Sequence, residues 1–382
     1  MTNSINGIPY ESPRPAREDD FELLQLGADL KDAKFESPPI GFFKDATLRL
    51  AKNKAAVAAL VIILVVSAMA VFGPMMTAYA FDQQFVDYQN MPPRIPLLAP
   101  LGIADGSRVL ENRRADGLSD TEKYPEGCIL KVMNRRTVNG VEMVDVKVDY
   151  YRYSGCEENF LLGSDYLGRD LWTRLWRGTR VSLFIAVFSV VTNVIIGVIY
   201  GSVAGYYGGK LDMVLMRVCE IIQSFPRVVV ATLFIMFFGT GIFSIIMSLL
   251  ISGWIQTARL VRAQFYRFKG REYVLAARTM GVRDRAIIFR HILPNSLGPI
   301  ITTMMIAVPQ AIFTESFLAY IGLGLKAPEP SIGVLLSEGQ KVLLNFPYQS
   351  LFPGIVISAL MISFNLFGNG LRDAMDPTLR GT

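Results

Sequence analysis

Polar and ionisable side chains lie inside long apolar runs of this 382-residue chain. Glu315 shares one such run with Gln310 and Thr314, while Asn193 and Asn365 lie in two others. Such groups are costly inside a membrane, so those present there are candidates for a substrate pathway. Polar contacts between packed helices explain the same five residues equally well.

Groups for covalent chemistry or nucleotide hydrolysis are not apparent in the sequence. The single histidine, His291, has no recognisable nucleophile or carboxylate partner, so packing or docking is the expected role. The stretch "AGYYGGKLD" at residues 204–212 lacks the GxxxxGK[ST] spacing and the hydroxyl that would hold Mg²⁺. We therefore expect no catalytic residue, cofactor, metal site or nucleic-acid partner in this chain.

A basic segment separates two of the apolar runs. Residues 259–290 contain nine Lys or Arg side chains against two acids, Glu272 and Asp284. Loops rich in Lys and Arg beside membrane spans remain in the cytoplasm. The segment therefore predicts a cytoplasmic loop, placed at 265–294.

Within this loop, "EYVLAARTMGVRDRAIIFRHILP" (residues 272–294) predicts two short helices, at 271–280 and 284–292. Gly281 suits a left-handed cap after the first helix, Asp284 suits the start of the second, and Pro294 predicts its end. A partner groove or a lipid surface accounts equally well for the predicted apolar stripes. These stripes comprise Leu275, Ala276, Thr279 and Met280 in the first helix, and Ile287, Ile288 and Ile292 in the second.

The apolar runs themselves predict a polytopic membrane protein. Hydrophobic residues make up 51% of the chain, and several uncharged runs reach the roughly 20 residues that cross a bilayer. Uncharged residues 228–258 are too long for one crossing, and "FFGTGIF" at 237–243 predicts a break. Six spans follow, at 55–79, 181–205, 218–238, 242–260, 296–320 and 350–370.

The N-terminal 54 residues predict a cytoplasmic tail and an amphipathic lead-in without a signal peptide. Lys44, Arg49, Lys52 and Lys54 precede the first span, which also favours a cytoplasmic N-terminus. Six spans then place both termini in the cytoplasm. Residues 161–180 predict an amphipathic helix on the outer surface before the second span.

Residues 80–165 form a polar insert that this topology places outside the membrane. Asn139-Gly140 predicts a two-residue hairpin turn, followed by a strand in which Val144, Val146 and Val148 alternate with charged residues. Pairing across this turn brings Cys128 close to Cys156 and predicts a disulfide, with two free thiols as the alternative.

Several motifs resemble those of bacterial ABC importer permeases. Their signature loop matches Leu275-Ala276-Ala277, Gly281 and Leu293-Pro294, with Leu275 standing where that motif has glutamate. Glu272 is the nearby carboxylate. The stretches "GSDYLGRDLWTRLWRGTRVSL", "AGYYGGKLD", "IGLGLKAPEPSIGVLLSEG" and "NGLRDAMDPTLR" resemble permeases of the oligopeptide, dipeptide and nickel subfamily.

This resemblance implies an all-α polytopic protein with the six helices of the type I ABC importer permease fold. The small extracytoplasmic β-hairpin insert is predicted from the residue pattern above and is not assigned by the resemblance. It implies a second homologous permease, two cytoplasmic ATPases that bind ATP and Mg²⁺, an extracellular solute-binding protein, and a place in the cell membrane. The residues implied in ATPase coupling are Glu272, Leu275, Ala276, Ala277, Arg278, Gly281, Arg283, Asp284, Leu293 and Pro294.

Alternative functions differ in what they leave unexplained. An ion-coupled secondary transporter would leave the cytoplasmic docking loop without a role. Such transporters are often built from inverted repeats, and the sequence shows no convincing repeat of this kind. A membrane-anchored signalling protein leaves the polar residues of the spans without a role. The sequence does not distinguish dipeptides, longer peptides, nickel chelates or other small solutes as cargo, and it assigns no role to the insert.

Overall fold

The computed structural model of the chain describes residues 4–5, 8–9, 42–97, 99–138 and 140–375. The chain divides into two units, residues 1–44 and 45–382. In the first, β1 (Ser4–Ile5) and β2 (Ile8–Pro9) pair antiparallel. Most of the predicted N-terminal tail lies outside the described residues.

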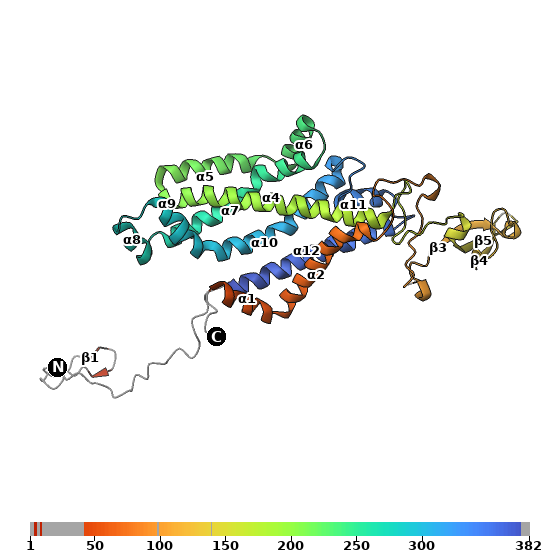
Figure 1. Ribbon diagram of the computed structural model, residues 1–382, viewed down its shortest axis with the longest axis horizontal. Helices are drawn as coiled ribbons and strands as arrows, with labels where there is room; N and C mark the ends of the chain where they lie inside the picture. The colour runs from red at the N-terminus through yellow and green to blue at the C-terminus, as the bar shows by residue number, and fades with distance from the viewer. Residues whose placement is uncertain (1–3, 6–7, 10–41, 98, 139, 376–382) are drawn as a thin grey trace. The chain divides into compact units, whose positions relative to one another are not determined.

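Long helices form the body of the second unit and lie side by side in Figure 1. Five are long and apolar enough, within the described residues, to cross a membrane. Each of these helices contains one of the uncharged runs of the sequence. Asn53 caps the first of them, α2, because its side chain accepts a hydrogen bond from the Ala56 N–H. They are α2 (Lys54–Phe72, extended by a 3₁₀ turn to Met75), α4 (Leu171–Tyr207), α7 (Ile242–Phe268), α10 (Leu293–Leu318, within the helical run Asp284–Leu323) and α12 (Tyr348–Met375).

The sequence predicted a continuous helix at 218–238, which is wrong. The structure instead has α5 (Gly209–Ser224) and α6 (Arg227–Phe238), bent by 78°. Phe225 between them is extended, because the ring of Pro226 disfavours helical geometry in the residue before it. A sixth span exists only if this bent pair counts as one.

Helix α4 begins ten residues before its expected span. Asp170 caps it by accepting from the Thr173 N–H, so 171–180 continue directly into the apolar run and form no separate surface helix. Further along, α4 packs closely on α7: a Cβ added at Gly201 would lie 2.3 Å from the Ala258 carbonyl oxygen. Only glycine permits this approach.

A three-stranded antiparallel sheet lies at one end of the helices, with strand order β3-β5-β4 (Figure 1). The strands are β3 (Ser107–Arg114), β4 (Ile129–Val138) and β5 (Val141–Asp149). Val144, Val146 and Val148 of β5 are buried, as the alternation predicted, and pack with Leu110 of β3. The sequence analysis missed β3.

The predicted disulfide is absent, and Cys128 and Cys156 are free thiols. The Asp149 N–H donates to the Cys128 carbonyl, so Asp149 and not Cys156 lies beside Cys128. The chain then turns into α3 (Tyr150–Tyr153), which carries Cys156 into an aromatic cluster with Tyr151 and Phe160.

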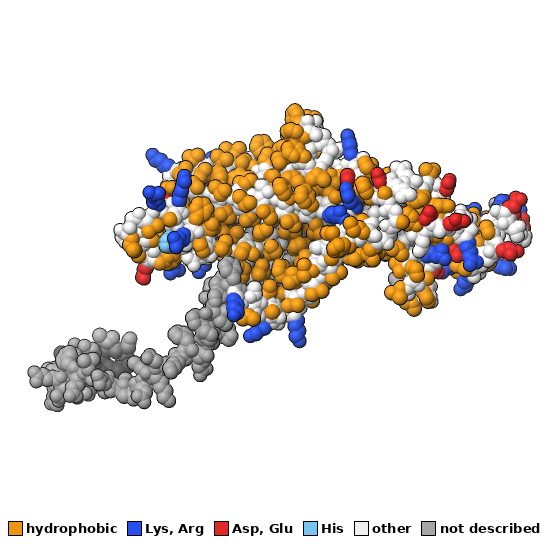
Figure 2. Space-filling view, viewed as in Figure 1, with side chains coloured by type: hydrophobic (Ala, Val, Ile, Leu, Met, Phe, Trp, Pro, Cys, Tyr) orange, Lys and Arg blue, Asp and Glu red, His pale blue; other side chains and the backbone are white. Residues whose placement is uncertain are grey.

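Short elements complete the unit. The helix α1 (Phe42–Lys52) precedes α2, and α11 (Ile332–Lys341) packs against α12. Three 3₁₀ turns, η3 (Val86–Tyr88), η4 (Ala99–Leu101) and η5 (Ala115–Ser119), lie between α2 and β4. Figure 2 shows hydrophobic side chains over the helical body, with charged side chains gathered towards its ends and over the sheet. This distribution suits a helical body surrounded by lipid.

Candidate functional site

A compact helical segment, residues 271–294, lies at the end of the helices opposite the sheet (Figure 1); we name it the coupling element. It contains α8 (Glu272–Thr279), a turn at Gly281, α9 (Asp284–Ala286) and a π-helical turn (Ile287–Ile292) that continues into α10. The predicted stop at Pro294 is wrong. Pro294 falls at the start of α10, directly after the π turn, and the helical run continues through it.

Gly281 ends α8 with the left-handed conformation that the sequence predicted, at φ +76°. The Val282 N–H donates to the Ala277 carbonyl and the Gly281 N–H donates to the Arg278 carbonyl. These two bonds form a Schellman cap, which satisfies carbonyls at the helix end. The cap holds α8 and α9 in a defined relative orientation.

The coupling element is anchored to the long helices by an apolar cluster. Val274 of α8 and Ile287, Ile288 and Ile292 of the π turn are buried. They pack with Tyr206 of α4, Val261 and Phe265 of α7, and Ile300 of α10. Burial of this kind contributes roughly 1.5–3 kcal/mol per large side chain. A displacement of α8 is therefore passed to three long helices.

Polar contacts add to this anchor. The Tyr206 hydroxyl donates to the Asp284 carboxylate at 2.5 Å, and the Arg278 guanidinium lies 5.4 Å from the centre of the Tyr206 ring. Tyr206 at the end of α4 thus contacts both halves of the coupling element. The sequence analysis did not single out this tyrosine.

The two predicted apolar stripes differ in their accessibility. Leu275, Ala276, Thr279 and Met280 are exposed on α8, with Leu275 47% exposed. The second stripe, Ile287, Ile288 and Ile292, is buried within the chain, so its prediction as a docking face is wrong. Of the other predicted coupling residues, Ala277 is buried and Leu293 half-buried, while Glu272, Arg278, Gly281, Arg283, Asp284 and Pro294 are exposed.

A cavity of about 640 Å³ lies between α4, α6, α7 and α10. Three predicted pathway residues, Asn193, Gln310 and Thr314, line it together. Its volume falls in the range of small-molecule sites, roughly 300–1,000 Å³. Because α4, α7 and α10 also hold the coupling element, the same helices join the two sites.

Two predicted pathway residues lie elsewhere. Glu315 is fully buried beside α4, where the Ser182 hydroxyl donates to its carboxylate at 2.8 Å. Asn365 donates to the Met361 carbonyl within α12 and does not line the cavity. Glu315 lies five residues from Gln310 and one from Thr314, so it faces another side of α10.

The sequence analysis also missed residues of the cavity wall. Ser248 and Ser252 of α7 line it. Gln256, Thr303 and Arg227 contribute further polar side chains. The four-residue spacing of the serines identified one helix face, but only the fold shows that this face meets a cavity.

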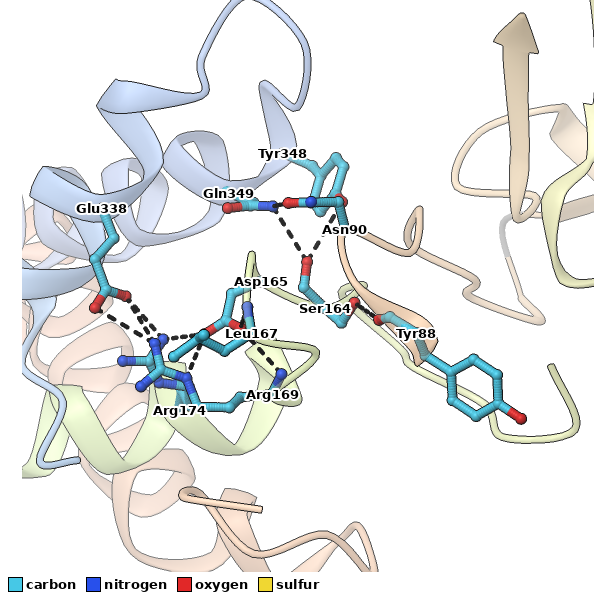
Figure 3. Close-up of polar contacts among 10 residues, drawn as sticks. All are labelled: Tyr88, Asn90, Ser164, Asp165, Leu167, Arg169, Arg174, Glu338, Tyr348 and Gln349. Atoms are coloured by element: carbon cyan, nitrogen blue, oxygen red, sulfur yellow. Dashed lines mark hydrogen bonds and ion pairs between the residues drawn. The ribbon is translucent and has the colours of Figure 1, made fainter. Parts of the chain in front are cut away.

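Buried charges join the loop before α4 to α11 (Figure 3). Arg169 and Arg174 are each 1% exposed and both bind the Asp165 carboxylate, with Arg169 Nε at 2.7 Å. Glu338 of α11 is the second acid, 2.8 Å from Arg174. Beside this network, Gln349 of α12 donates to Asn90 and to the Ser164 carbonyl. The network fixes α11 and the insert to the start of α4.

The electrostatics of this network have identifiable causes. Burial alone would lower the pKa of Arg169, but the neighbouring carboxylates of Asp165 and Glu338 raise it. Asp170 is different, because burial raises its pKa and the hydrogen bonds from Thr173 offset this only in part. One Asp170 oxygen, Oδ1, is buried without a hydrogen-bond partner among the described residues. The paired acids therefore stabilise the arginines, whereas ionised Asp170 is under strain from desolvation.

Comparison with known proteins identifies relatives over most of the chain. The family model described as binding-protein-dependent transport system inner membrane component matches residues 195–381, and that of the N-terminal TM domain of oligopeptide transport permease C matches 41–93. The oligopeptide permease protein OppC of Bacillus subtilis (strain 168) is 35% identical over 91% of this chain and 93% of its own. The dipeptide permease protein DppC of the same strain is 34% identical over 95% and 94%. OppC of Escherichia coli (strain K12) is 42% identical over 58% and 73%.

Proposed function

Because this chain belongs to the family of inner membrane components of binding-protein-dependent transport systems, we propose that it is a permease subunit of an ATP-driven peptide importer. The observation that carries this proposal is the shared set of helices. Helices α4, α7 and α10 line the cavity and also hold the coupling element. Force applied to α8 thus reaches the cavity wall directly.

The remaining parts of the transporter follow from the same premise. A second homologous permease completes the pathway, two cytoplasmic ATPases bind ATP and Mg²⁺, and a solute-binding protein delivers the cargo. ATP hydrolysis belongs to those separate subunits and not to the permease. The exposed α8 face around Leu275 is the surface that fits a groove on an ATPase.

The proposed mechanism is alternating access with a fixed docking contact. Closure of the ATPases moves α8, and the buried cluster of Val274 and Ile287 carries α4, α7 and α10 along. Leu275 makes an apolar contact where related permeases use a carboxylate, and Glu272 lies exposed three residues earlier on the same helix. Dispersion and burial of the Leu275 side chain then supply the docking energy that a charged contact supplies in related permeases.

We also propose the orientation of the chain. Six spans, with α5 and α6 forming one broken span, place both termini and the coupling element in the cytoplasm. The sheet of β3, β4 and β5 is then extracytoplasmic, where it can meet the binding protein. The excess of Lys and Arg in residues 259–290 supports this direction.

Transport by the complete assembly tests the proposal. The chain, a second permease, two ATPases and the binding protein are reconstituted in liposomes, and uptake of a labelled peptide is measured with ATP at the ATPase side. We expect ATP-dependent accumulation that stops when the ATPases are omitted. Accumulation driven by an ion gradient without ATPases would establish a secondary transporter instead.

Charge reversal in the coupling element tests the docking surface itself. Arg283→Glu replaces an exposed cation between α8 and α9 and is expected to lower recovery of the ATPases with the purified chain about tenfold. Arg135→Glu, exposed on β4, is the matched control and leaves recovery unchanged. Equal recovery with both variants would contradict docking at this element.

A further inference from the structure

One cation lies on the cavity wall without a partner. Arg227 is the first residue of α6, directly after the break at Phe225 and Pro226, and its side chain is exposed. Among the described residues, none forms an ion pair or hydrogen bond with its side chain. Glu220, the acid seven residues earlier, pairs with Arg217 at 2.7 Å instead.

Arg227 also lies deep in the proposed membrane region. Helix α5 has 16 residues and carries the chain about 24 Å from Gly209 before the bend. Asn193 on the same cavity wall lies near the middle of the uncharged residues 181–207 of α4. A charge at this depth is costly, and such charges mark substrate pathways.

The rest of the wall complements this charge. Among the lining residues that the structure describes, Arg227 alone is charged, so no carboxylate neutralises it inside the cavity. Among the described residues, Ser189 Oγ and Asn193 Oδ1 are buried without a hydrogen-bond partner, which is rare. Both residues line the cavity, together with the exposed neutral side chains of Gln256 and Gln310. The wall thus offers one cation together with neutral groups for hydrogen bonding.

We propose that Arg227 binds the free C-terminal carboxylate of a peptide in this cavity. A guanidinium matches the planar carboxylate with two parallel hydrogen bonds. The proposal rests on the proposed function, and it adds that the permease itself selects peptides with an unblocked C-terminus. A lipid phosphate offers the same charge, so the test separates the two sources.

Uptake of a peptide and of its C-terminal amide distinguishes these possibilities. The complete reconstituted transporter is assayed with labelled trialanine and with trialanine amide, using the same binding protein throughout. Arg227→Gln is compared with Arg227→Lys, which keeps the charge, and with Arg217→Gln, which removes a paired cation outside the cavity. Recovery of the intact complex by size-exclusion chromatography monitors folding of each variant.

We expect Arg227→Gln to lower trialanine uptake about tenfold, because a hydrogen bond to a charged group is lost, and to leave uptake of the amide unchanged. Arg227→Lys is expected to keep most of the trialanine uptake relative to uptake of the amide. Arg217→Gln is expected to take up both peptides as the unaltered protein does. A bound lipid phosphate or a packing role predicts that Arg227→Gln lowers uptake of both peptides equally, and this result overturns the proposal. Unchanged uptake of trialanine by Arg227→Gln overturns it as well. If the unaltered transporter moves neither peptide with ATP, peptide import fails as a function, and the carboxylate site fails with it.

Discussion

At the scale of single residues, the arginines before and at the start of α4 are neutralised by two carboxylates, Asp165 and Glu338. Asp165 accepts hydrogen bonds from the Leu167 and Arg169 backbones and binds both Arg169 and Arg174. Both guanidinium groups are almost completely buried. Removal of one partner from such a pair leaves an uncompensated buried charge, which costs about 3–5 kcal/mol.

Asp165→Ala is therefore expected to destabilise the chain by about 3–5 kcal/mol. The midpoint of thermal unfolding of the detergent-solubilised protein measures this loss. Asp116→Ala removes an exposed acid that pairs with exposed Arg114, and we expect an effect below about 1 kcal/mol. Similar midpoints for the two variants would show that the buried network contributes little.

The desolvated carboxylate of Asp170 predicts a dependence on pH. Its pKa is raised in the folded state, so its contribution to stability is fully present below the ordinary aspartate pKa of about 4 and is lost as the pH rises through the raised value. We therefore compare the unfolding midpoints of the unaltered protein and of Asp170→Asn. The difference, unaltered protein minus variant, should decrease as the pH rises through this window. Thermal unfolding from about pH 2 upwards, at intervals of about half a unit, measures the difference for Asp170 and also covers the lower window of Asp145.

Asp145 in β5 supplies a control of opposite sign. A hydrogen bond from the Asn112 N–H, and then one from Asn134, lower the pKa of Asp145. Its contribution is present above the ordinary aspartate pKa and is lost as the pH falls through the lowered value. For Asp145→Asn the same difference should increase as the pH rises. If the difference for Asp170→Asn also increased with pH, the assignment of strain to Asp170 would be contradicted.

At the scale of helices and turns, the Schellman cap at Gly281 sets the angle between α8 and α9. A side chain at φ +76° is strained by roughly 1–2 kcal/mol. Gly281→Ala should therefore loosen the cap and lower ATP-driven peptide uptake about fivefold, since about 1 kcal/mol corresponds to such a factor. Uptake by proteoliposomes containing the complete transporter provides the measurement.

Gly270→Ala is the matched control, because Gly270 precedes α8, has no positive φ and has open space around it. We expect uptake to remain unchanged in this variant. If both glycine variants lost uptake equally, the cap would not be the cause.

The same elements show what the sequence could predict. Uncharged runs identified α2, α4, α7, α10 and α12, because lipid excludes charge along a whole span. Alternation identified the buried face of β5, and the position of Gly281 identified the cap of α8. Each of these signals is local, so each depends on few residues.

Other features depend on distant contacts and could not be read in the same way. Glu315 and Gln310 look alike as polar residues of one span, and only the packing of α10 on α4 separates a buried acid from a cavity residue. The predicted span 218–238 ran through Phe225–Pro226, so the sequence prediction contained neither the break nor its 78° bend. The disulfide failed because α3 turns Cys156 away from Cys128 after β5 ends.

At the scale of the whole molecule, the proposed orientation predicts opposite exposure of two sites. Ser119→Cys places a thiol on the exposed η5 turn of the insert, and Thr279→Cys places one on the exposed face of α8. A membrane-impermeant maleimide should label the first in intact cells and the second only after lysis. Both variants are made with Cys128, Cys156 and Cys219 replaced by alanine.

The control is peptide uptake by the chain with all three cysteines replaced by alanine. Uptake equal to that of the unaltered protein shows that these replacements leave the transporter intact. Labelling of Thr279→Cys in intact cells would place the coupling element outside and contradict docking to a cytoplasmic ATPase. The result bears on the six-span proposal as well. Helix α4, the broken span and α7 make three crossings between the two sites, whereas without the broken span there are only two, which would place both sites on the same side.

The helical run Asp284–Leu323, which leaves helical geometry only at Gly322 near its end, has a mechanical consequence. Its 40 residues span about 60 Å, from the coupling element past the cavity. If it swings by about 10° around a pivot near its middle, each end travels about 5 Å, in opposite directions. A small push at α9 then turns the α10 wall of the cavity through the same angle. In the proposed alternating-access cycle, this rotation connects the docking surface to the cavity through a single helical run.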